Sequence, residues 1–124
     1  MPIRQTISHP DRLIIGVATG EVTLPDLVAF ARGIAEAGLV HYRKIVDVVE
    51  AQPSFSEAEL KAFAQYVREY PVPGKRGALA FVVGPSPGAF AKLFASIEIP
   101  GRPAQAFRSI HDARKWLAAN TPED

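Results

Sequence analysis

ALAFVV, at residues 78–83, is the longest run of consecutive apolar residues in this chain of 124 residues. Successive side chains of a strand point to opposite faces of a sheet, so a run without polar positions has no face turned to water. Such runs are typical of central strands in parallel sheets whose two faces are both covered. The run therefore predicts an α/β fold with this segment near the centre of the sheet.

Helix signals lie on both sides of this strand along the chain. Before it, Ser56 and Glu59 form a capping box, and Pro-Val-Pro-Gly at 71–74 ends the helix that follows them. After it, Ser86 is a cap residue and Pro87 occupies the first helical position. A strand between two helices is the repeating unit of a parallel sheet.

Two further helices are predicted toward the ends of the chain. Thr23 and Asp26 begin one, which Gly38 ends as a left-handed residue after the last turn. Ser109 and Asp112 begin the last helix, whose apolar positions predict that Ala113, Trp116 and Leu117 are buried.

The predicted order of elements is β-β-α-β-α-β-α-β-α, in one domain over residues 1–120 with a frayed tail at 121–124. The segment 51–55 is predicted to be a loop. The fold class is α/β with a five-stranded, mostly parallel mixed sheet in which only the first strand is antiparallel. The predicted strands are residues 3–8, 13–19, 45–49, 78–83 and 104–107.

Composition excludes several kinds of site. The chain has no cysteine, which rules out disulfides and cysteine-ligated metals, and its net charge of +1 gives no overall attraction for nucleic acid. The first residues lack the apolar core of a signal peptide, and the run at 78–83 is too short to cross a bilayer. We therefore expect a cytoplasmic protein without nucleic-acid partner or membrane insertion.

Metal and nucleotide sites are not indicated either. His9, His41 and His111 are not at ligand spacing, and GPSPG at 84–88 departs from the phosphate-binding Walker pattern. We expect no metal and no cofactor.

Three segments resemble a known family. KIVD at 44–47 is similar to the second core strand of the STAS domain, RGALAFVV at 76–83 to its third, and FRSIHDARKWL at 107–117 to its closing strand and helix. The resemblance is to the SpoIIAA-like group, which is related in fold to the SEC14 lipid-binding domain, and it covers most of the chain. It implies a regulatory or protein-interaction module without catalysis. Members switched by phosphorylation carry Ser or Thr almost directly after the strand that ends here at Asp47, whereas residues 48–53 are VVEAQP, so the resemblance does not imply that switch.

Several polar residues are candidates for binding a ligand or partner. Asp47 ends an apolar strand at the sheet edge where α/β sites gather, but its carboxylate also suits backbone N–H groups of a nearby helix start. Ser56 suits a phosphate at a helix N-terminus, or it serves only as the cap. The full candidate set is Asp47, Glu50, Ser54, Ser56 and Ser86.

Basic residues stand just before the parallel strands and are predicted to share one rim of the sheet. They suit either an anionic partner or the negative ends of the helices, which lie at the same rim. The set is Arg43, Lys44, Lys75, Arg76 and Arg102.

Three functions fit these observations. The first is the interaction module, whose partner is another protein or a second copy of the chain. If the linking helices all lie on one face of the sheet, a homodimer joined through the sheet covers the apolar surface of the other face. The second is a carrier or sensor of a small apolar or lipid-like ligand, as in the SEC14 relatives, and an enzyme using Asp47 is the third. A deep apolar cavity favours the carrier; a filled core with exposed apolar surface favours the module.

Overall fold

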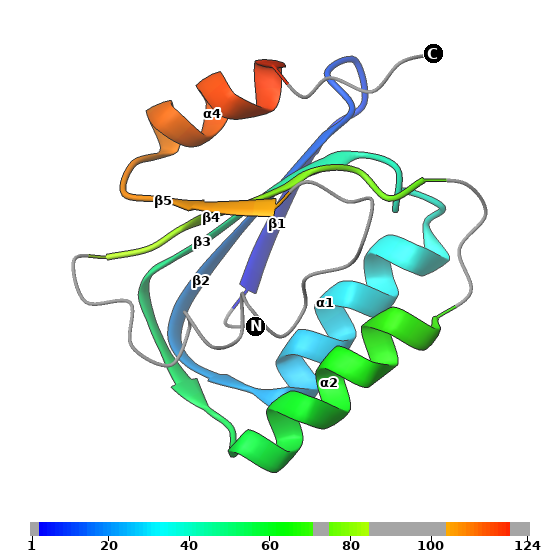
Figure 1. Ribbon diagram of the computed structural model, residues 1–124, viewed down its shortest axis with the longest axis vertical. Helices are drawn as coiled ribbons and strands as arrows, with labels where there is room; N and C mark the ends of the chain where they lie inside the picture. Colours follow the sequence, from blue (N-terminus) through cyan, green and yellow to red (C-terminus); the bar gives the residue numbers. More distant parts are fainter. Residues whose placement is uncertain (1–2, 71–74, 85–103, 120–124) are drawn as a thin grey trace.

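The computed structural model describes residues 3–70, 75–84 and 104–119, and within them it has an α/β architecture (Figure 1). In chain order the elements are β1 (Ile3–Ser8), β2 (Leu13–Thr23), α1 (Leu24–Glu36), β3 (Arg43–Ser54), α2 (Glu57–Glu69), β4 (Leu79–Val82), β5 (Ala104–Phe107) and α4 (Ile110–Ala119). The helix predicted to begin at Ser86 lies outside the described residues.

The strands form one five-stranded sheet in sequential order, β1-β2-β3-β4-β5. β1 pairs with β2 antiparallel, from Ile3 opposite Ala18 to Ser8 opposite Leu13. The pairs β2–β3, β3–β4 and β4–β5 are all parallel. The predicted mixed sheet, with β1 as its antiparallel strand, is confirmed.

Helices cover the two faces of the sheet unequally. α1 and α2 lie side by side on one face, and α4 lies on the other (Figure 1). The face under α1 and α2 contributes alternate residues of the strands to a core with Leu60, Phe63 and Ala64 of α2. The opposite face packs against Ala113 and Leu117 of α4. Central strands between two helical layers account for the apolar run at 78–83, all of which is buried.

The strands β2 and β3 are longer than the sequence indicates, and the predicted loop at 51–55 is wrong. Their parallel pairing continues to Thr23 opposite Ser54, with a β-bulge between Val17 and Thr19. Pro53 lacks a backbone N–H and argues against a strand on local grounds. Cross-strand pairing with β2 overrides that preference, because the backbone groups of each strand need partners.

The helix ends follow the sequence signals. Thr23 and Ser56 each make a complete capping box, with Asp26 and Glu59 as the reciprocal partners. α1 ends at Glu36 with Ala37 as its C-cap, and the next residue, Gly38, has a φ of 72° in the left-handed region. Leu39 N donates to Ile34 O, as a Schellman motif requires.

The last helix is docked differently from the prediction. Ala113 and Leu117 are buried at 0 % and 2 % exposure, whereas Trp116 is only partly buried and packs its ring against Phe107. The helical stripe thus centres on Leu117, and the prediction that Trp116 is buried is met only in part. A bilayer-spanning helix is not found in the described residues.

Candidate functional site

The amino ends of the parallel strands gather basic side chains, as the sequence indicates. Lys44 is 7 % exposed, and its Nζ donates to the carbonyl oxygens of Val40 at 2.7 Å and Tyr42 at 2.8 Å. A buried ammonium needs such acceptors, because burial without hydrogen bonds is strongly unfavourable. The segment that precedes β3 therefore folds around the Lys44 side chain.

The neighbouring arginine braces two distant segments. Arg43 donates through Nη1 to Leu117 O of α4 at 3.1 Å and through Nη2 to Asp11 O at 2.6 Å. It ties the end of α4 to the β1–β2 turn. This contact with the last turn of a helix agrees with a helix-end role for the basic residues.

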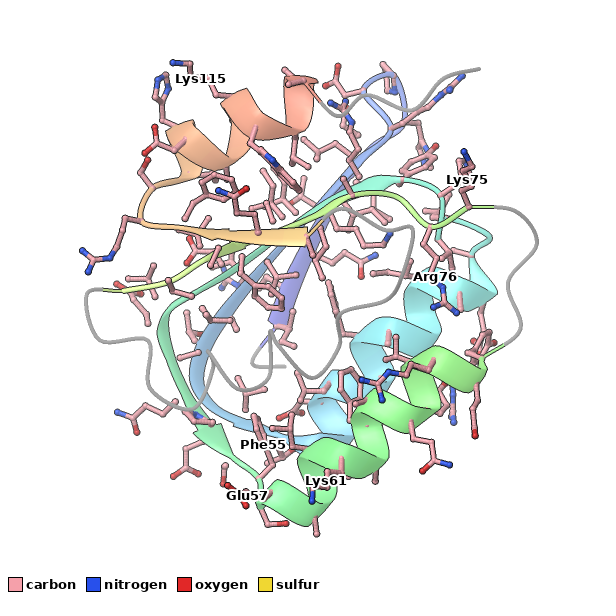
Figure 2. The ribbon with its side chains drawn as sticks, in the orientation of Figure 1. Phe55, Glu57, Lys61, Lys75, Arg76 and Lys115 are labelled. Atoms are coloured by element: carbon pink, nitrogen blue, oxygen red, sulfur yellow. The ribbon has the colours of Figure 1, made fainter. Side chains whose placement is uncertain are left out.

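Lys75 and Arg76 come shortly before β4, and their side chains point in different directions. Arg76 is directed toward α1 and α2, and its Nη2 donates to Tyr70 O, just past the end of α2, at 3.0 Å (Figure 2). Lys75 is exposed and directed away from these helices. Arg102, the last member of the predicted basic set, lies outside the described residues.

A cavity of about 130 Å³ lies between the sheet and the pair α1–α2. Its walls come from β1 to β4 and both helices, and most of the lining side chains are apolar. Lys44 and Arg76 are the charged residues among the described lining. Tyr66 and Tyr70 add hydroxyl groups, and the Tyr66 hydroxyl is buried without a hydrogen bond of standard geometry. Arg32 of α1 is near enough for its interaction with this hydroxyl to raise the pKa of the exposed guanidinium.

The opposite face of the sheet carries the candidate carboxylate. Asp47 is opposite Val17 of β2, which in turn is opposite Arg4 of β1, so the three residues share a face in one row across the strands. Asp47 Oδ1 accepts a hydrogen bond from Val49 N at 3.0 Å. Its backbone partner is therefore in the bulge of its own strand and not at a helix start.

Apolar side chains are exposed beside Asp47. Val17 is 37 % and Val49 48 % exposed. On this face α4 packs over β3, β4 and β5. Val17 of β2 lies beside this area and is exposed. Among the described residues, this part of the sheet has exposed apolar side chains next to the charged side chain of Asp47.

The fold as a whole has a known structural counterpart. The fold is similar to that of an uncharacterized protein of the DUF3478 family from Shewanella loihica PV-4, which has a SpoIIAA-like fold. The TM-score is 0.56 and the identity 19%, over 93% of this chain and 91% of that one. The fold is SpoIIAA-like. Neither a protein-family model nor a curated protein matches the sequence.

The SpoIIAA-like fold separates the predicted serines from Asp47. Ser54 is exposed at the end of β3, seven residues from Asp47, which at about 3.3 Å per residue is about 23 Å along the strand. Ser56 Oγ accepts from Glu59 N at 3.1 Å and so acts as the cap of α2. Glu50 is exposed after the bulge. Ser86 lies outside the described residues.

Two of the three histidines contact Tyr42. A hydrogen bond of 2.8 Å joins His9 Nδ1 and the Tyr42 hydroxyl, and the His41 ring packs edge-on against Tyr42 with centroids 4.9 Å apart. His111 is exposed in the first turn of α4. In the described ranges no three His, Asp or Glu residues come together as metal ligands would.

The cavity under α1 and α2 is the site that sequence reasoning missed. Part of its wall is made of small residues, Ala18 of β2 and Ala31 and Ala35 of α1. Ala31 and Ala35 are four residues apart and so share one face of α1. Short side chains at both positions indicate unfilled space on this face of α1. This signal can be used only when it is known which strands face the helix.

Proposed function

We propose that this chain is a regulatory or protein-interaction module of SpoIIAA-like fold, without catalysis and located in the cytoplasm. The observation that carries the proposal is the exposure of Val17 on the sheet face that α4 covers only in part, with Val49 exposed in the adjacent bulge. A central strand normally hides its β-branched residues, and exposed apolar residues that cluster on a sheet mark contact surfaces.

The partner that fits this face is a second copy of the chain. The row across the strands has Arg4 on one side of Val17 and Asp47 on the other. A two-fold axis near Val17 places Arg4 of each copy opposite Asp47 of the other, so the surface is complementary to itself. The proposed homodimer is thus apolar at its centre and joined by opposite charges at its margins.

The oligomeric state of the purified chain tests this proposal. We expect light scattering at micromolar concentration to give a dimer, and Val17→Asp to give a monomer because it places like charges at the centre of the interface. Ala62→Asp, on the exposed side of α2, is the matched control and leaves the dimer unchanged. A wild-type chain that is monomeric over the whole concentration range contradicts the proposal.

Charge exchange gives a sharper test of the geometry. Arg4→Glu alone is expected to weaken the dimer, because it faces Asp47 of the second copy. Arg4→Glu combined with Asp47→Lys restores the pairing with reversed sign and is expected to restore the dimer. Failure of that rescue, while both variants remain folded, contradicts the proposed two-fold arrangement.

A second function is favoured by one specific observation, the apolar cavity of about 130 Å³ between the sheet and α1–α2. Apolar concave sites with a few polar groups are typical of small-molecule binding. The cavity lies on the face opposite to Val17, so binding a small apolar ligand is compatible with the interaction module. Binding of apolar probes to the purified chain, measured by calorimetry, tests this function.

A further inference from the structure

The size of the cavity limits its ligand. An engineered apolar cavity of about 150 Å³ in another protein holds benzene, so a volume of about 130 Å³ suits an apolar group of about six carbon atoms. A two-chain lipid is many times larger than this space. The part of a ligand that the cavity holds is therefore compact.

The charges of the lining limit the ligand further. Lys44 and Arg76 are both cationic, and the described lining includes no Asp or Glu. The two residues come from one end of the cavity, where the starts of β3 and β4 are joined by the bond from Lys44 N to Ala78 O. Val22 and Val48, also in the lining, lie toward the other ends of β2 and β3. The cavity thus has a basic end and an apolar end.

The hydrogen bond to the end of α2 uses only part of the donor groups at this basic end of the cavity. A guanidinium has five N–H donors, and the bond of Arg76 to Tyr70 O occupies one. A carboxylate accepts two parallel bonds from a guanidinium, and such charge-assisted bonds are stronger where water is excluded. An acidic group at this end also balances the charge of Arg76 beside an apolar space.

We propose that the cavity binds a small apolar monocarboxylic acid, with its carboxylate at Arg76 and its hydrocarbon part between the sheet and α1–α2. The proposal rests on the second function above and names its ligand class. It is independent of the dimer, because the cavity and the Val17 surface lie on opposite faces of the sheet.

Isothermal titration calorimetry with hexanoate, benzoate, hexan-1-ol and hexylamine tests the proposal on the full chain at neutral pH. Hexanoate and benzoate are expected to bind about tenfold more tightly than the alcohol, and the amine least. Chain length gives a second criterion: affinity is expected to rise from butanoate to hexanoate and to gain little more at dodecanoate, whose chain exceeds the cavity. If acid and alcohol bind equally, the acidic ligand class is wrong while the apolar site stands. If no probe binds, the small-ligand function itself is wrong.

Two pairs of variants locate the site. Arg76→Met is expected to remove the preference for acid over alcohol, whereas Lys75→Met, the exposed neighbour, keeps it. Ala31→Leu fills the space and is expected to abolish binding of every probe without loss of folding, and Gly33→Ala on the exposed side of α1 has no effect on binding. Unchanged hexanoate binding in both Arg76→Met and Ala31→Leu overturns the proposed location.

Discussion

Replacing Gly77 with alanine places a methyl group against the backbone that precedes β3. A Cβ at this position lies far inside van der Waals contact with Tyr42 O and only 2.6 Å from His41 O. Carbon–oxygen contact begins at about 3.5 Å, so the two segments must separate by about 1 Å or more. Backbone atoms cannot rotate away as the end of a side chain does.

The cost follows from the bonds that cross this contact. Gly77 N donates to Val40 O at 2.9 Å, and Lys44 N donates to Ala78 O at 2.8 Å. Overpacking costs about 1–3 kcal/mol, and each weakened buried bond adds about 0.5–1.5 kcal/mol. We therefore expect Gly77→Ala to lower the free energy of unfolding by about 2–6 kcal/mol.

A urea melt followed by far-UV circular dichroism measures the loss. Gly33→Ala is the matched control, since a Cβ there meets nothing within 4 Å and alanine favours a helix interior. It is expected to stabilise the chain by about 0.5–1 kcal/mol. If the two variants have the same midpoint, the close approach of Gly77 to residues 41–42 is not part of the folded state.

Three further outcomes are expected. Leu117→Ala is expected to lower the free energy of unfolding by about 2–5 kcal/mol in urea melts, and Trp116→Ala by less, because Leu117 is fully buried and Trp116 is not. The reverse order would mean that α4 is rotated from the position given above. Ser56→Ala is expected to lower the free energy of unfolding by about 1 kcal/mol, because α2 loses its cap. Ser54→Ala, at an exposed position, is the control and is expected to have no effect. Equal losses in the two variants contradict the capping role of Ser56. Elemental analysis finds no stoichiometric zinc and millimolar EDTA leaves the melting temperature unchanged, whereas a shift of several degrees contradicts the expected absence of a metal.

Local signals predict the fold because they act within a few residues. The run at 78–83 indicates a strand covered on both faces, and the boxes at Thr23 and Ser56 set the starts of α1 and α2. Pairing partners are not local. The continuation of β3 through Pro53 depends on β2, which is why the predicted loop at 51–55 was wrong.

The candidate sites depend still more on tertiary structure. Lys44 reads as a solvent-facing residue before a strand, yet it is buried because carbonyl oxygens of residues 40 and 42 surround its ammonium. Asp47 was predicted from its place at the end of an apolar strand, but its bond to Val49 exists only because of the bulge. The cavity arises from small residues on facing elements, which no single stretch of sequence reveals.

The long pairing of β2 with β3 bears on the order in which the molecule comes apart. β4 pairs with only residues 44–47 of β3, whereas β2 stays with β3 as far as Thr23 opposite Ser54. Thr23 caps α1, and Ser54 is two residues before the cap of α2, so both helices start from the end of the same two-stranded ribbon. We therefore expect the strands and helices of residues 13–69 to open together, as one cooperative unit. We expect amide protons there to exchange with solvent more slowly than those of β5, whose four residues pair, among the described strands, with β4.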